Sequence, residues 1–386
     1  MDAFLKTLQT LPEASELIAR VENGGCPAVL TGTAPVQRAC IGAAVAAGTG
    51  RPAVFLCADE REARQLAGDL QSLTGQEPVT LLAREWQFRP NAVASREWER
   101  SRLAALYRMA SGAVPAVVAT IDALMTRTLP PQRLAALSVT LRPGDRVELG
   151  ALTERLVQAG YSRCEQVEGV GQFAIRGGIL DVFSPLMEQP VRCEFFDDEV
   201  DSLGAFDPGT QRRTENVSAA LLLPAAEVLP GLAPGGPARL AEELERLAVK
   251  YAKKAETAAV AQTLRGDAER FRTGAAVEGL DRYLSLIYPD AVCGADYLPP
   301  DAVVFFCGDA NFLADGAVGR AGLDRERRRV FAHGQYAAIA LALHAQQQHA
   351  VFRVDAEHLF AVDRLDVRAL VLDPCLVDVD AVPAVR

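Results

Sequence analysis

The stretch AVLTGTAPVQRACIGAAVA, residues 28–46, has the order of elements of a phosphate-binding loop: an apolar run, a Thr-Gly-Thr turn and an Ala-rich helical pattern. A working loop continues with Gly-Lys-Thr, because glycine lets the backbone approach phosphate, lysine neutralises it and the hydroxyl holds magnesium. Proline lacks an amide hydrogen and valine has no oxygen. The turn here reads Thr31, Gly32, Thr33, Ala34, Pro35 and Val36. We therefore expect a strand–turn–helix unit with a degenerate, non-binding phosphate loop.

The same alternation of strand and helix patterns extends over residues 1–137. The apolar runs PAVFLCA, PVTLL and PAVVAT each come before a helical pattern, such as DEREARQLAGDLQSL after the first. Continuous apolar runs between helices indicate strands covered on both faces, as in a parallel sheet. Pro130 and Pro131 end this unit. We expect a parallel-sheet α/β domain over residues 1–137.

The pattern changes over residues 138–224, where short runs alternate apolar and polar residues. GQFAIRG, GILDVFSP, PVRCEFF and VDSLGAFD have this period of two, and one helical pattern, LGALTERLVQAG, lies before them. Such runs predict a small α+β domain with a mostly antiparallel sheet, inserted into the α/β body. FFDDEVDS predicts a hairpin that turns at Asp197 and Asp198. The expected core residues are Phe173, Ile175, Leu180, Val191, Cys193 and Phe195.

A Pro/Gly-rich stretch, LLPAAEVLPGLAPGGPARL, follows the small domain and is expected to be a connector. Long helical patterns come next, and then a second α/β pattern with the strands AVVFFC, HAVFRV and VRALVLD. Residues 225–386 are therefore predicted to be the second part of the α/β body.

Charge and cysteine usage limit the possible functions. The 386 residues carry a net charge of −10, which disfavours a chain that grips a phosphate backbone unaided and favours a protein partner. The eight cysteines are scattered without a C-x-x-C pair, and the four histidines all follow residue 330. We expect reduced core thiols, no metal and no other cofactor. MDAFLKTLQTLPEASEL lacks the apolar core of a signal peptide, so a cytoplasmic protein is expected.

Strand parity identifies a candidate binding face in the small domain. In PVRCEFF, Val191, Cys193 and Phe195 share one face, so Arg192 and Phe196 lie on the other. By the same alternation, Arg176 of GQFAIRG points outward. An exposed phenylalanine beside arginines has the composition of a protein-interface hot spot. The alternative is an arginine that extends along the surface and a phenylalanine covered by a loop.

The block GQFAIRGGILDVFSP, then PVRCEFFDDEVDSLGAFDPGTQRR and ALLLPAAEV, resembles the UvrB-homology module of the bacterial transcription-repair coupling factor (Mfd). The segments ERSRLAALYRM, VVATIDALM, PPDAVVFF and VFRVDAEHLF resemble that module in the same order. The resemblance spans nearly the whole chain. It implies a helicase-like α/β body with a degenerate phosphate loop and an inserted domain similar to the second domain of UvrB.

The resemblance also implies a function. The module is similar to UvrB in the surface that engages UvrA, and the UvrA contacts of the family fall on Arg176, Arg192 and Phe196. The short segment REWQFRPNAVASRE, residues 84–97, leaves no room for the DNA-clamping hairpin of UvrB. In the family, the module precedes regions that bind RNA polymerase and double-stranded DNA, the latter an ATP-dependent translocase. No second phosphate-loop motif occurs in the chain, so we expect either a fragment or a shortened homologue, not catalytic by itself.

Two other functions remain as alternatives. An active NTPase or helicase half needs a metal-binding carboxylate after a strand, and Asp59-Glu60 is the nearest candidate, although helix capping explains it better. A DNA-binding domain needs a basic stripe with aromatic residues, for which only VKYAKK at 249–254 qualifies. A solvated helix face explains that run.

Overall fold

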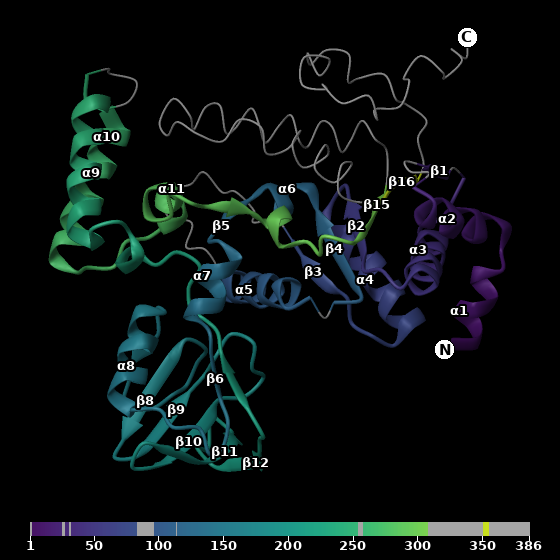
Figure 1. Ribbon diagram of the computed structural model, residues 1–386. Helices are drawn as coiled ribbons and strands as arrows, with labels where there is room; N and C mark the ends of the chain where they lie inside the picture. The colour runs from purple at the N-terminus through teal and green to yellow at the C-terminus, as the bar shows by residue number, and fades with distance from the viewer. Residues whose placement is uncertain are drawn as a thin grey trace. The chain divides into compact units, whose positions relative to one another are not determined.

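The computed structural model describes residues 2–24, 28–30, 32–82, 96–112, 114–253, 258–307 and 350–354. The chain divides into two compact units. The first contains Met1–Ala83, Arg108–Thr126 and Tyr297–Arg386, and the second contains Arg84–Tyr107 and Arg127–Asp296 (Figure 1).

The first unit is built on a parallel sheet of six strands. From edge to edge the strands are β1 (Ala28–Leu30), β16 (Ala350–Val354), β15 (Val303–Cys307), β2 (Ala53–Cys57), β4 (Ala116–Thr120) and β3 (Val79–Leu81). Every neighbouring pair is parallel. Among its described residues, the helices of this unit are α1 (Asp2–Gln9), α2 (Pro12–Glu22), α3 (Pro35–Thr49), α4 (Glu60–Thr74) and α6 (Ile121–Met125). The α/β class and the parallel sheet expected from the sequence are confirmed.

The central strands of this sheet form the core of the first unit. Phe55 of β2 stacks on Phe305 of β15, with ring centroids 4.9 Å apart. Helix α3 approaches this stack through Gly42, where a Cβ atom would lie 2.3 Å from the Phe55 ring. A side chain at that position would force the helix away from the sheet, so glycine is required there.

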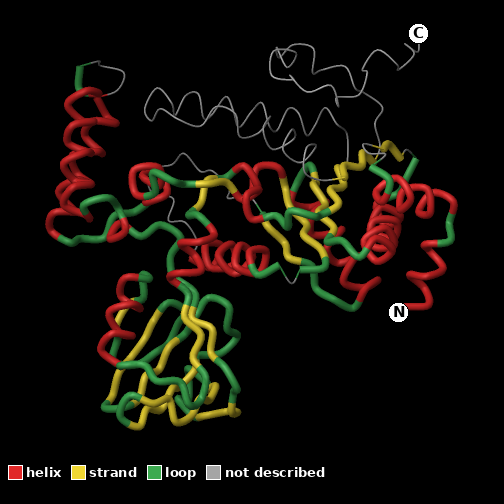
Figure 2. The backbone as a smooth tube through the Cα atoms, in the orientation of Figure 1, coloured by secondary structure: helices red, strands yellow, loops and turns green. Residues whose placement is uncertain are grey.

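The second unit contains a mostly antiparallel six-stranded sheet, and its strands are coloured yellow in Figure 2. The strands run in the order β12 (Arg213–Asn216), β11 (Glu199–Phe206), β10 (Val191–Phe196), β9 (Ile179–Val182), β8 (Gln172–Arg176) and β7 (Ser162–Arg163). Only the β7–β8 pair is parallel. Two-stranded sheets join β13 (Ala220–Leu222) to β6 (Val139–Leu141) and β14 (Val292–Cys293) to β5 (Arg127–Thr128).

Helices complete the second unit. They are α5 (Arg96–Ala110, whose last residues belong to the first unit), α7 (Pro131–Leu137), α8 (Leu149–Gln158), α9 (Gly236–Tyr251), α10 (Ala258–Thr273) and α11 (Leu284–Ile287). Short 3-10 turns lie at Pro230–Leu232, Leu280–Tyr283 and Gly294–Tyr297. Helices α9 and α10 pack along each other.

The core of the six-stranded sheet agrees with the predicted one. Phe173, Leu180, Val191 and Cys193 are buried in it. Ile175 and Phe195 pack against it with partial exposure. The hairpin is also confirmed, since Phe196 pairs with Glu199 and Asp197 adopts a φ of 60° in the turn.

The predicted connector after β13 is not a free linker in its first part. Leu223, Glu227 and Leu229 are buried. The backbone of this segment is bonded to the small sheet domain, where Ala225 N donates to Ala159 O at 2.8 Å. It is also bonded to the helical part, where Leu229 N donates to the Tyr288 hydroxyl at 3.0 Å. The Pro/Gly-rich composition predicts a connector, but the consecutive residues Leu222–Leu223 and Val228–Leu229 are buried.

The domain boundaries at 138 and 224 remain a prediction, which limited proteolysis can test. We expect elastase, which cleaves after small residues, to cut at the exposed Gly231 before it cuts at Ala225 or Ala226. A first cut within the sheet at 171–206 would contradict a compact domain over 138–224. Terminal sequencing of the earliest fragments gives the order of these cuts.

Candidate partner-binding surface

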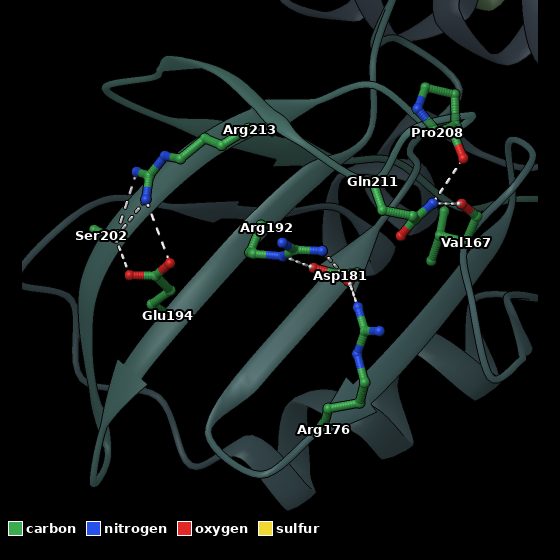
Figure 3. Close-up of polar contacts among 9 residues, drawn as sticks. All are labelled: Val167, Arg176, Asp181, Arg192, Glu194, Ser202, Pro208, Gln211 and Arg213. Carbon is green, nitrogen blue, oxygen red and sulfur yellow. Dashed lines mark hydrogen bonds and ion pairs between the residues drawn. The ribbon is translucent and has the colours of Figure 1, made fainter.

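The sequence-predicted residues lie on the sheet face opposite its main core. Arg192 of β10 is opposite Asp181 of β9 and Gly204 of β11. Its strand neighbours Val191 and Cys193 point into the core, so alternation sends the arginine to the other face. The structure therefore brings Arg176, Asp181 and Arg192 together from three adjacent strands (Figure 3).

Asp181 binds both arginines. Its side chain is fully buried, and its Oδ1 and Oδ2 accept hydrogen bonds from Arg192 Nε at 2.7 Å and Nη2 at 2.9 Å. Arg176 Nη2 donates to the same Oδ2 at 2.5 Å. A buried carboxylate without such partners would cost several kcal/mol, and the two arginines supply hydrogen bonds to both oxygens of Asp181.

Arg192 is more enclosed than strand parity indicates. Its side chain is 19% exposed, and its guanidinium carbon lies 4.8 Å from the centroid of the Phe206 ring. The hydrogen bond to Asp181 raises the pKa of the Arg192 guanidinium above its ordinary value. Parity gave the correct face of the strand, but that face carries a second small core, formed by Val167, Ala174, Phe183 and Phe206. The expectation of a solvent-exposed Arg192 is thus corrected.

Arg176 and Phe196 are open to solvent. The Arg176 side chain is 51% exposed although it is bonded to Asp181. Phe196 is 80% exposed, the highest fraction among the large hydrophobic residues that the structure describes. It lies at the end of β10 beyond a register shift between Glu194 and Phe195. An exposed aromatic ring on a sheet face that also carries arginines is a candidate contact residue for a protein partner.

A second polar cluster continues the face towards the sheet edge. Glu194 accepts a hydrogen bond from Ser202 Oγ at 2.8 Å, and Arg213 Nη1 lies 3.4 Å from Glu194 Oε1. Arg213 Nη2 also donates to Leu203 O at 2.9 Å. Strand alternation predicts Glu194 on the face of Arg192 and Phe196, whereas Asp181, Ser202 and Arg213 were not predicted to lie there. The available signal for Asp181 was the same alternation, which puts it on the opposite face from Leu180 and Val182.

The turn predicted to be a degenerate phosphate loop is in the first unit, and Thr31 is outside the described residues. Gly32 has a φ of 75°, and Pro35 is the first residue of α3. The Ala34 N–H, at the helix start, donates to Gln37 Oε1 at 2.8 Å. Arg38 Nη1 binds Glu62 Oε1 at 2.6 Å, so this cation is neutralised within the protein.

The carboxylate proposed for an active NTPase has another role. Asp59 Oδ1 accepts the Glu62 N–H at 2.8 Å and caps α4, as the sequence indicated. Among the described residues, no three His, Cys, Asp or Glu side chains are grouped as a metal site would require. The six cysteines in the described part of the chain are free thiols. Within the same part, no helix has both the length and the apolar character needed to cross a membrane.

Two predictions fall largely outside the described residues. The segment at 84–97, expected to be too short for a DNA-clamping hairpin, is described only from residue 96. The strand VRALVLD, expected after residue 354, is not described either. Of that region, β15 and β16 confirm the predicted strands AVVFFC and HAVFRV.

Comparisons with known proteins agree with this geometry. Residues 139–227 match the model of the UvrB interaction domain family. The transcription-repair-coupling factor of Bacillus subtilis is 30% identical over 310 residues, which are 79% of this chain and 26% of the relative. That of Myxococcus xanthus is 37% identical over 190 residues, covering 46% of this chain and 16% of the relative. That of Escherichia coli is 34% identical over 178 residues, with coverage of 46% and 15%.

The first of these relatives extends the similarity well beyond the six-stranded sheet, since it covers 79% of the chain. The chain spans about a quarter of the length of that relative. The similarity therefore concerns one module of a larger protein. The chain belongs to the transcription-repair-coupling factor family and corresponds to its N-terminal UvrB-homology module.

Proposed function

We propose that this chain acts in transcription-coupled nucleotide excision repair by binding UvrA. The observation that carries the proposal is the exposed Phe196 ring, 80% accessible, on the domain that matches the UvrB interaction family. Arg176, from β8 of the same sheet, adds a cation to the same surface. Aromatic residues and arginines are enriched among the hot-spot residues of protein interfaces.

The proposed contact residues are Arg176, Arg192 and Phe196. Arg176 and Phe196 are accessible for direct contact. Arg192 is enclosed against Asp181 and Phe206, which supports an indirect contribution. The direct test is a calorimetric titration of purified UvrA with the whole chain. Saturable binding is expected, and absence of binding at micromolar concentrations would overturn the proposal.

We also propose that the turn at 31–36 is a phosphate loop that has lost nucleotide binding, in an α/β body of helicase-like ancestry. Pro35 removes a backbone donor, the Ala34 N–H is bonded to Gln37, and Arg38 is paired with Glu62. A phosphate would have to displace these contacts and would find no lysine in the turn.

The expected result is that ATP with magnesium does not change the melting temperature of the chain. A ligand present at 100 times its Kd contributes about 2.7 kcal/mol to stability, which a thermal scan detects easily. ATP affinity better than millimolar, lost when Ala34–Val36 are replaced, would contradict the prediction. Binding that survives these replacements would point to a different site.

The remaining proposed partners are partners of the whole coupling factor and not of this module. We propose that RNA polymerase and double-stranded DNA are engaged by other regions of the coupling factor, and that the protein works in the cytoplasm with them. The net charge of −10 supports a protein partner for this module over direct DNA binding. A salt-sensitive micromolar affinity of the chain for DNA would contradict this assignment.

A further inference from the structure

Asp181 is a buried carboxylate that bridges two of the proposed contact residues but is not itself exposed to a partner. It lies between Arg176 and Arg192, and each of its oxygens accepts at least one guanidinium hydrogen bond. Arg192 occupies both oxygens through Nε and Nη2. Arg176 uses only Nη2, so its Nε and Nη1 have no partner within the described residues.

We infer that Asp181 is a positioning residue, which holds the exposed Arg176 guanidinium in the orientation that UvrA receives. This inference rests on the proposed UvrA binding. Arg176 has a long side chain that would otherwise sample many rotamers, and fixing it before binding reduces the entropy lost in the complex. Asp181 is itself fixed by Arg192, whose guanidinium is bidentate and stacked on Phe206. Arg192 therefore acts on the contact through Asp181.

The distribution of exposure supports this division of roles. Along the series Arg176, Asp181, Arg192 the side-chain exposures are 51%, 0% and 19%. Arg176 is therefore accessible to a partner, whereas access to Arg192 is restricted. A carboxylate that bridges two arginines also keeps the net charge of the group at +1, so the two cations do not repel each other.

A double-mutant cycle with purified UvrA tests the inference. Asp181→Asn keeps the shape but replaces one acceptor oxygen by an NH₂ group that accepts no hydrogen bond, so one amide oxygen remains for three guanidinium hydrogen bonds and Arg176 is held less firmly. We expect this variant to bind about tenfold more weakly, the order expected for ordering one long side chain on binding. Arg176→Ala should then reduce UvrA affinity much less in the Asp181→Asn background than in the original chain. Phe196→Ala should reduce the affinity by the same factor in both backgrounds.

The controls separate positioning from general damage. Glu194→Gln changes a carboxylate on the same face that does not contact Arg176, and it should leave UvrA affinity within about threefold. Arg192→Lys keeps a cation opposite Asp181 but loses the bidentate hydrogen bonds, so it should loosen Asp181 and lower UvrA affinity by no more than Asp181→Asn does. In the Arg176→Ala background it should have little further effect, whereas an equal loss in both backgrounds would show a direct contact of Arg192 and overturn the inference.

The outcomes also separate this inference from the proposed function. Failure of the unaltered chain to bind UvrA, or full binding by Arg176→Ala and Phe196→Ala, would refute the site itself. Additive effects of Asp181→Asn and Arg176→Ala, with the site intact, would refute only the positioning role. Melting curves check that each variant is folded, and if Asp181→Asn does not fold, the Arg192→Lys result decides.

Discussion

Phe196→Ala is expected to weaken UvrA binding by about thirtyfold without destabilising the protein. Truncation of a central hot-spot residue typically costs about 2 kcal/mol or more, which is roughly thirtyfold in Kd. The ring is 80% exposed, so the free protein loses few contacts when it is removed. Substitutions at such positions usually change the free energy of unfolding by less than about 0.5 kcal/mol.

A titration of UvrA with each variant, beside a melting curve, measures both quantities. Phe4→Ala is the matched control, because Phe4 is also an exposed phenylalanine, 49% accessible, but belongs to the first unit. It should not change UvrA affinity. Equal affinity of Phe196→Ala and the unaltered chain would remove Phe196 from the site.

Arg192→Ala is a less informative variant than the sequence suggests. Loss of the Arg192 guanidinium removes the contact with Phe206 and two hydrogen bonds to the buried Asp181, which keeps its bond to the exposed Arg176. The small stability change expected for a solvent-facing arginine therefore applies to Arg176 and not to Arg192. Loss of UvrA binding by Arg192→Ala must be compared with its melting temperature before it is attributed to the contact.

The local features of the fold were predictable from the sequence because they depend on neighbouring residues. Continuous apolar runs gave the parallel strands, as at Ala53–Cys57, and period-two runs gave the antiparallel ones. The hairpin at Asp197 and the cap at Asp59 follow from turn and cap preferences. Parity also identified the correct face for Arg192.

The remaining features depend on which strands become neighbours. The Asp181–Arg192 pair arises from the β9–β10 register, and no periodicity within one strand specifies its partner. The burial of Arg192 depends on Phe206, which comes from β11. The Pro/Gly-rich composition of the segment after β13 predicts a connector, whereas its apolar residues Leu223 and Leu229 are buried by distant parts of the chain. Long-range packing, which overrides local preference, accounts for these differences.

Glu227, in the segment that follows the small sheet, forms a buried ion pair with Arg102 of α5. The distance from Arg102 Nε to Glu227 Oε1 is 3.2 Å, and the two side chains are 1% and 8% exposed. The Glu227 N–H donates to Glu99 Oε1 at 2.7 Å, so the same residue is attached to α5 twice. This pair connects sequence positions 125 residues apart inside the second unit.

Glu227→Ala is expected to destabilise the protein by up to about 3–5 kcal/mol, because it removes one carboxylate from a buried ion pair. Urea unfolding, followed by circular dichroism, measures the loss. Glu242→Ala is the control: Glu242 pairs with Arg239, both more than 60% exposed, and its removal should cost less than about 1 kcal/mol. The double variant Arg102→Met, Glu227→Leu should recover most of the lost stability, since an apolar pair requires no charge compensation. A loss below about 1 kcal/mol for Glu227→Ala would mean that water or another group compensates Arg102, and the segment would then not be held to α5 by this pair.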